Sequence, residues 1–181
     1  MKSPQTSELL KLCEFNSNDK FKLLYRASRD GFHANKFHSK CDGHMNTLTI
    51  FKARETSYVF GAFTLATWES FERGEWKSDP NAFLFSLTNK DNEPCKMKID
   101  ADKSEYAIYC RSRRGPSFGC SMLHEGRDIY VADNADIEES SSNLGYTYKH
   151  SKYLFGTCEA KSFFAGSEKF QLSEIEVYQK V

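Results

Sequence analysis

Short apolar runs separated by polar turns fill the chain from residue 47 onward, and this pattern constrains the fold more than any other feature. Runs of this length, rich in aromatic and β-branched residues, predict strands. The turns RET (54–56), NKDNE (89–93) and HEG (124–126) join neighbouring runs and predict antiparallel hairpins. Many such strands predict a mainly β fold with a few short helices (α+β), built as a β-sandwich of two antiparallel sheets. The runs are TLTIFKA (47–53), SYVFGAFT (57–64), NAFLFSLT (81–88), PCKMKID (94–100), EYAIYC (105–110), SFGCSML (117–123) and RDIYVADN (127–134).

The C-terminal run KFQLSEIEVYQKV contains a change of phase. Phe170 and Leu172 have one strand parity, whereas Ile175 and Val177 have the opposite one. A strand with a period of two residues cannot bury both pairs on the same side. Either a bulge near Ser173 shifts the phase, or the strand is covered on both faces, and the sequence leaves both open.

Two helices are predicted before residue 47. Ser3 and Pro4, a capping residue followed by a residue that fits a first helical turn, predict a helix over about 4–14. A second helix is predicted over 32–41. The segment KFKLLYRAS (20–28) between them fits either a strand or a helix.

Three histidines and a cysteine lie within twelve positions, and each is a possible metal ligand: His33, His38, Cys41 and His44. In a helix over 32–41, with about 100° of rotation per residue, Ala34, Phe37 and Cys41 form one apolar stripe. His33 and His38 then lie on opposite shoulders of that stripe and do not converge on one ion. A structural zinc site needs four ligands, so the sequence favours flanking histidines over a metal site, and we expect no metal.

The charge balance excludes several classes of partner. The 181 residues include 25 basic and 25 acidic side chains, so the formal net charge is zero. General nucleic-acid-binding proteins and polybasic membrane anchors both need a basic excess. No stretch approaches the roughly 18 apolar residues of a membrane-spanning helix, so we expect no membrane insertion. The first residues lack the apolar run of a secretory signal, which predicts a cytoplasmic protein.

Six cysteines are spread along the chain without a CxxC pair. In a chain of this length without a signal sequence, they predict reduced thiols rather than a disulfide framework. No P-loop or dinucleotide-binding fingerprint is present, and we expect no cofactor.

The segment CRSRRGPSFGC places Arg111, Arg113 and Arg114 close to two cysteines. One interpretation is an anion-binding or phosphate-binding patch. A second is an activated thiol pair, because nearby arginines lower a thiol pKa and a hairpin over this segment would put Cys110 opposite Cys120. The sequence favours a third interpretation, a hairpin loop with solvated arginines, because no phosphate-binding motif accompanies the patch.

Two acidic segments allow further alternatives. DNADIEESSSN (133–143) could bind calcium, but the EF-hand spacing is absent, so a long solvated loop is favoured. WESFERGEWKSD (68–79) holds Glu69, Glu72 and Glu75 among aromatic residues, as a glycosidase cleft would. The sequence favours a partly helical connector whose aromatic rings dock on the sandwich while the carboxylates face water.

The order of segments along the chain is more specific than any single motif. Eleven segments, taken in their order along the chain, closely resemble the TLDc domain family over residues 20–181. We expect the leading helix and linker of 1–19 to belong to the same domain, so that 1–181 is a single TLDc domain. The segments are FKLLYRASRDGF, FHSKCDG, TLTIFKA, YVFGAFT, DPNAFLFSLTNKD, YAIYC, GPSFG, DIYVADNA, SSNLGYTY, FGTCEAKSFFAGS and FQLSEIEVYQK.

The resemblance implies a β-sandwich and a non-catalytic function. Members of the family are linked to resistance to oxidative stress, and several bind the cytosolic sector of the vacuolar proton pump (V-ATPase). No catalytic centre is established for them, so the resemblance implies a protein-interaction domain, monomeric in isolation, and not an enzyme. The alternatives are a thiol-based antioxidant that uses Cys110 and Cys120, or a metal- or glycan-binding β-sandwich.

The candidate binding residues come from the matched segments and the arginine-rich loop. Many relatives carry a glycine-rich run before the dipeptide that matches Phe118 and Gly119, where this chain reads RSRRGPS, which puts the contacts of that loop in question. Many relatives end in Glu-Val-Trp, where this chain has Glu176, Val177 and Tyr178, so an aromatic ring is kept for packing. The candidates are Arg111, Arg113, Arg114, Phe118, Gly119, Glu159, Glu174 and Glu176.

Overall fold

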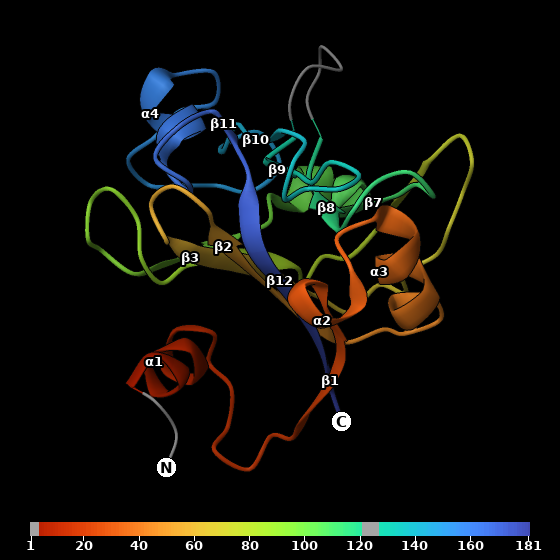
Figure 1. Ribbon diagram of the computed structural model, residues 1–181. Helices are drawn as coiled ribbons and strands as arrows, with labels where there is room; N and C mark the ends of the chain where they lie inside the picture. The colour runs from red at the N-terminus through yellow and green to blue at the C-terminus, as the bar shows by residue number, and fades with distance from the viewer. Residues whose placement is uncertain (1–3, 121–126) are drawn as a thin grey trace.

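The computed structural model describes residues 4–120 and 127–181, and its strands form two six-stranded sheets (Figure 1). All paired neighbours within the two sheets are antiparallel, so the predicted mainly β fold with two antiparallel sheets is confirmed. The first sheet has the order β1 (Phe21–Arg26), β12 (Leu172–Lys180), β2 (Thr47–Ala53), β3 (Val59–Thr64), β5 (Phe83–Ser86), β6 (Cys95–Lys98). The second has the order β11 (Lys169–Phe170), β10 (Ser140–Ser142), β9 (Ile129–Tyr130), β8 (Ser117–Phe118), β7 (Ile108–Cys110), β4 (Glu75–Lys77).

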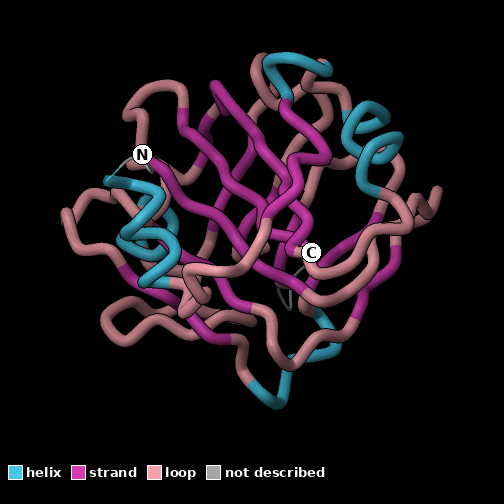
Figure 2. Tube along the Cα trace, turned by 90° about the horizontal axis from the view of Figure 1, so that it is seen from below, coloured by secondary structure: helices cyan, strands magenta, loops and turns pink. Residues whose placement is uncertain are grey.

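Short helices lie around the strands, which occupy the middle of the molecule (Figure 2). The two helices predicted near 4–14 and 32–41 are confirmed as α1 (Pro4–Leu12) and α3 (Ala34–Cys41), each with shorter bounds. The predicted apolar stripe of α3 is buried in the core.

The segment 20–28 combines the two structures that its sequence allowed. Its first part is β1, and the chain then enters the single turn of α2 (Ala27–Asp30). The other described helices are α4 (Cys158–Ser162) and the 3-10 helix η1 (Ala101–Tyr106).

Aromatic side chains fill the space between the two sheets. Trp68 is fully buried, and its ring packs edge-on against Phe37 and Phe118, with centroid distances of 5.1 and 5.6 Å. Its indole N–H donates to Thr47 Oγ1 at 2.9 Å, so the buried polar atom of the ring is satisfied.

A second apolar cluster lies on the opposite, outer face of the first sheet. Strand alternation directs Leu48 and Ile50 of β2 to this face, while Phe51 points into the core. Helix α1 covers part of the outer face with Leu9 and Cys13, and Figure 1 shows it on the side away from the second sheet. The first sheet is therefore apolar on both faces.

The hairpins of β2 with β3 and of β5 with β6 confirm the predicted pairings, but three other strands are shorter than their apolar runs. The run EYAIYC begins inside η1, which leaves only Ile108–Cys110 for β7. The runs SFGCSML and RDIYVADN contribute two residues each, to β8 and β9. The HEG turn between them lies outside the described residues.

Two strands occur where none was predicted. The segment 68–79 contains β4 and no helix, so the prediction of a partly helical connector was wrong. The segment 133–143, predicted as a long loop, ends in β10. Serine hydroxyls make that strand compatible with burial, because Ser140 Oγ accepts from the Ala132 N–H at 3.2 Å and Ser142 Oγ donates to the Lys161 carbonyl at 2.9 Å.

The phase change in the C-terminal run is explained by a bulge. The register of β12 against β2 shifts between Leu172 and Glu174, so a bulge near Ser173, one of the two alternatives that the sequence left open, is present. Leu172, Ile175 and Val177 are consequently all buried. Phe170 belongs to β11, so the run also passes from the second sheet into the first.

Candidate functional site

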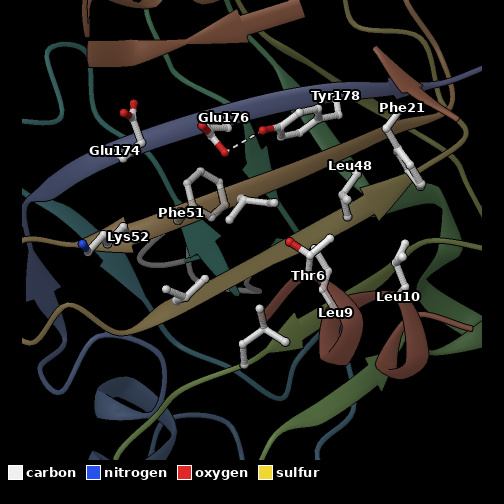
Figure 3. A pocket seen from close by; sticks show the side chains of 13 residues that line it. Thr6, Leu9, Leu10, Phe21, Leu48, Phe51, Lys52, Glu174, Glu176 and Tyr178 are labelled. Carbon is white, nitrogen blue, oxygen red and sulfur yellow. Dashed lines mark hydrogen bonds between the residues drawn. The ribbon is translucent and has the colours of Figure 1, made fainter. Parts of the chain in front are cut away.

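A groove with a volume of about 390 Å³ lies on the outer face of the first sheet, beside α1 (Figure 3). Its floor is apolar and comes mainly from β2, with apolar side chains of α1 beside it, while β12 supplies two carboxylates and a tyrosine. The lining residues are Thr6, Leu9, Leu10, Phe21, Leu48, Ile50, Phe51, Lys52, Val59, Leu87, Glu174, Glu176 and Tyr178.

The groove exists because the outer face of the first sheet is only partly covered. Leu48 is 3% exposed because it belongs to the apolar cluster that α1 covers. Ile50 of β2 and Val59 of β3 belong to the edge of the same cluster and are only half-buried. The sequence contains a signal for this arrangement, since both parities of TLTIFKA carry large apolar residues. A half-buried strand would alternate with polar residues, so the pattern indicates a strand that is covered on both faces.

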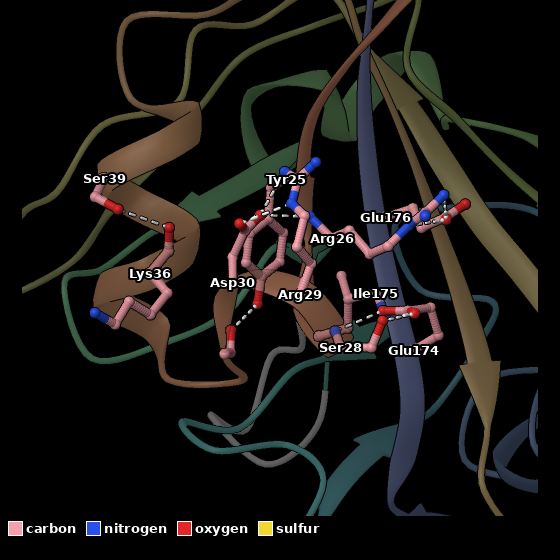
Figure 4. A network of polar contacts seen from close by, with 11 residues as sticks. Tyr25, Arg26, Ser28, Arg29, Asp30, Lys36, Ser39, Glu174, Ile175 and Glu176 are labelled. Atoms are coloured by element: carbon pink, nitrogen blue, oxygen red, sulfur yellow. Dashed lines mark hydrogen bonds and ion pairs between the residues drawn. The ribbon is translucent and has the colours of Figure 1, made fainter.

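One edge of the groove is built from two predicted binding residues, Glu174 and Glu176. Glu176 accepts from Arg26 Nε at 2.7 Å and from the Tyr178 hydroxyl at 2.9 Å (Figures 3 and 4). The charge of Glu176 raises the pKa of Arg26, and burial raises the pKa of Tyr178. Glu174 accepts from the backbone N–H of Ser28 at 3.0 Å.

Lys52 is a lining residue that the sequence analysis missed. It stands opposite Glu174 in the register of β2 and β12, and it is exposed. Its ammonium group has no ion pair or hydrogen bond within the described chain, whereas both carboxylates of the groove are partnered. The groove therefore offers an apolar floor and one unpartnered cation.

Three other predicted residues lie away from the groove. Phe118 is fully buried between the sheets, and Glu159 is exposed on α4. Gly119 has a φ of 74° and lies so close to Asp128 that a Cβ would be 2.1 Å from its Oδ2, so only glycine fits. Phe118, Gly119 and Glu159 therefore do not form a binding site together.

Asp128 itself is a buried carboxyl that holds the chain around Gly145. It accepts backbone N–H bonds from Gly145 at 3.0 Å, Thr147 at 3.1 Å and Tyr148 at 3.2 Å. The three hydrogen bonds lower the pKa of Asp128, but the effect of burial is larger and raises it to about 7.

The three predicted arginines are separated by burial. Arg113 is exposed, as the solvated-loop interpretation requires, whereas Arg111 and Arg114 are half-buried. Arg111 and Arg114 are therefore less exposed than that interpretation predicted. The loop between them is held by His38, whose Nε2 contacts the carbonyl oxygens of Arg111 at 2.9 Å and Arg114 at 3.1 Å.

His38 is a positioning residue beside the apolar stripe of α3. Its side chain is 6% exposed, and its Nδ1 contacts Asp42 Oδ1 at 2.7 Å. Both ring nitrogens face oxygen atoms, so the imidazole links Asp42 to the backbone of the loop. Asp42 also accepts from the Ser70 hydroxyl.

Cys110 and Cys120 do not form the opposed pair that the sequence suggested. Ile108 pairs with Phe118, so the register places Pro116, not Cys120, opposite Cys110. Both thiols are buried, and burial raises the pKa of Cys110 to about 11 and also raises that of Cys120. The arginines of this loop do not activate either thiol.

The remaining candidate ligands and carboxylates do not converge. His33 precedes α3, is exposed, and lies 3.6 Å from Asp133, while His44 contacts Gln179. No group of three or more histidine, cysteine or acidic side chains that could hold a metal ion occurs in the described ranges. Glu69 forms an ion pair with Lys77.

The comparisons with known proteins return one family. The family model described as the TLDc domain matches residues 1–181. No curated protein matches the sequence significantly.

Proposed function

Because the chain belongs to the TLDc domain family, we propose that it binds the cytosolic sector of the V-ATPase as a single domain of residues 1–181. At the level of the family, this is a protein-interaction domain related to oxidative stress, and such domains are generally regarded as non-catalytic. The observation that carries the proposal is the family match over the whole chain. The proposal includes a cytoplasmic location and a monomeric domain.

The groove beside α1 is the surface that we assign to this contact. Exposed apolar area that remains accessible on a folded protein is typical of interaction sites. Lys52 favours a partner segment that brings an acidic side chain, because it lacks a partner while Glu174 and Glu176 are already satisfied. We therefore assign to the groove an apolar segment of the pump with a carboxylate positioned to reach Lys52.

No described helix is long and apolar enough to cross a bilayer. The proposed contact with the pump is accordingly a protein–protein contact made at its cytosolic sector, and the test can be performed without lipid.

The test is binding of the purified chain to the isolated cytosolic sector of the pump, measured by biolayer interferometry. Ile50→Arg places a charge on the apolar floor, and Lys52→Glu reverses the unpartnered cation; each is expected to weaken binding at least tenfold. Lys22→Glu is the matched control, because Lys22 is an exposed lysine of the same sheet that does not line the groove. Its affinity is expected to change less than twofold.

Two results would contradict the proposal at different levels. If the unmodified chain does not bind the cytosolic sector, the partner is wrong. If it binds but Ile50→Arg and Lys52→Glu behave like Lys22→Glu, the partner stands and the groove is excluded as the contact. Circular dichroism of each variant separates lost binding from lost folding.

A further inference from the structure

Three arginines and two tyrosines form a cluster on the outer face of the second sheet, which we name the arginine–tyrosine cluster. Arg127 Cζ lies 4.0 Å from the ring centroid of Tyr109 and 5.8 Å from that of Tyr130. Arg114 Cζ lies 4.7 Å from the Tyr130 centroid, and Arg114 donates to the Tyr130 hydroxyl. Arg111 lies in the same loop as Arg114, since His38 Nε2 contacts the carbonyl oxygens of both, and its charge acts on both of the other arginines.

No ion pair within the described part of the chain neutralises the charge of this cluster. The charge of Asp133 acts on Arg114, but it forms no ion pair with that arginine. Among the described residues, the Nε atoms of Arg111 and Arg127 are buried without a hydrogen-bond partner. Burial lowers the pKa of Arg114 and of Arg127, and the neighbouring arginines lower each further. Bringing cations together without a counter-ion costs stability, which an anion would offset.

The loop that presents two of these arginines is fixed before any ligand arrives. His38 binds the carbonyl oxygens of Arg111 and Arg114, as described above. The next residue, Gly115, donates its N–H to the Val131 carbonyl at 3.1 Å. A Cβ on Gly115 would be 2.5 Å from Val131 Cγ1, so the loop lies directly on the chain after β9. Guanidinium groups on a fixed loop lose little freedom on binding.

We propose that the arginine–tyrosine cluster binds a phosphoryl group carried by a phosphorylated segment of a partner protein. A guanidinium presents its donors in a planar fork that matches phosphate and carboxylate oxygens. Three cations favour a group of charge about −1.5 to −2 over a carboxylate of charge −1. Arginine clusters are the usual device for recognising phosphorylated peptides.

The surroundings favour a phosphorylated protein over an anionic membrane. The chain has no net charge, so the overall electrostatic attraction between the molecule and anionic lipid headgroups is weak. The apolar side chains that are largely exposed among the described residues, such as Ile137 and Leu154, do not belong to the cluster. The positive charge is concentrated among aromatic rings, at the scale of a single phosphoryl group.

Trp76 supplies a built-in reporter for the test. Its ring centroid lies 4.5 Å from that of Tyr109 and 5.1 Å from Arg127 Cζ. The other tryptophan, Trp68, is fully buried between the sheets. An anion that binds Arg127 is therefore expected to change the fluorescence of Trp76 alone, and Trp76→Phe should remove the signal without removing binding.

The experiment titrates the full chain with a phosphoserine peptide of otherwise neutral sequence, following fluorescence and calorimetry. We expect saturable binding that weakens with added salt. Arg127→Gln and Arg111→Gln should each reduce the affinity at least tenfold. Arg54→Gln is the control, since it removes the same charge from an exposed position in the turn between β2 and β3 and should change the affinity less than twofold. Arg111→Gln keeps the test valid if Arg127→Gln fails to fold.

Parallel titrations separate the sources of the anion. Inorganic phosphate should compete with the peptide, and a peptide with glutamate in place of phosphoserine should bind at least tenfold more weakly. Equal binding of the glutamate peptide would overturn the assignment of a phosphoryl group. Tight binding to vesicles that contain a phosphoinositide, without binding of the phosphopeptide, would assign the cluster to a membrane instead. The absence of saturable binding, or an equal loss in Arg54→Gln, would overturn the site itself.

Discussion

Replacing Cys110 by serine should lower the stability of the domain while leaving the survival of cells under peroxide unchanged. Cys110 is fully buried in β7 within the apolar core, where the backbone of Glu69 is its polar neighbour. A buried serine hydroxyl whose hydrogen bonds are only partly satisfied there costs about 1–3 kcal/mol. We expect the free energy of unfolding of Cys110→Ser to fall by that amount in urea titrations, and that of Cys120→Ser, which is 7% exposed, to fall by less.

The reactivity of Cys110 follows from the same burial. A thiol with a pKa of about 11, compared with about 8.5 for a free cysteine, has roughly 300-fold less thiolate at neutral pH. Since the thiolate is the nucleophile, oxidation by peroxide should slow by a similar factor. Cys158 is exposed and provides the matched control.

The assay is alkylation of the native protein with monobromobimane, followed by mass spectrometry of the labelled peptides. Cys158 should react rapidly, while Cys110 should react only as the protein unfolds. Survival of cells under peroxide is then compared for the unmodified chain and the Cys110→Ser/Cys120→Ser double variant, at matched levels of folded protein. Rapid native labelling of Cys110, or full loss of protection in a double variant that still folds and binds its partner, would refute the reasoning and favour a thiol mechanism.

Three further predictions concern the frame of the sandwich. Because the pKa of Asp128 is raised, its contribution to the free energy of unfolding is complete below pH 4 and is lost as the pH rises to about 7. The contribution lost is about 4 kcal/mol, at 1.36 kcal/mol per pKa unit. Asp128→Asn should therefore remove this dependence of the free energy of unfolding on pH, as measured by urea denaturation. His38→Ala should release the arginine loop, which increased amide hydrogen exchange at residues 111–115 would reveal, while unchanged exchange would contradict the role. Gly61→Ala should destabilise the first sheet by about 1–3 kcal/mol, because the new Cβ would lie 2.0 Å from the Thr49 carbonyl oxygen and 2.6 Å from the Phe85 ring; a thermal midpoint equal to that of the unmodified chain would contradict it.

The sequence was informative wherever apolar periodicity alone determines the structure. The hairpins over 47–64 and 81–100 and the phase change near Ser173 follow from residues whose burial has a period of two. Strands β4 and β10 carry no such signal. The first has three residues and only a half-buried tryptophan at its centre, and the second consists of serines whose hydroxyls are satisfied locally. Their positions depend on pairing partners that are distant in the chain.

The candidate sites were harder to predict than the strands because they are assembled across the sheets. Glu174 and Glu176 were named from the matched C-terminal segment, but their partners Arg26 and Ser28 are about 150 residues away along the chain. Arg127 joins the arginine loop only because β8 and β9 follow β7 in the second sheet. The pattern of residues in the sequence can identify a charged loop, but the pairing of the strands determines which charged side chains lie close together.

The alternation of the strands places the two proposed binding surfaces on opposite outer faces of the sandwich. In β2, Phe51 enters the core while Ile50 faces the groove, and in β7, Ile108 enters the core while Tyr109 faces outward beneath Arg127. A partner in the groove therefore does not cover the arginine–tyrosine cluster, and the two share no lining residue. Each can be occupied while the other is filled, so a phosphorylated segment would add to binding of the pump rather than compete with it, as linked sites on one domain do.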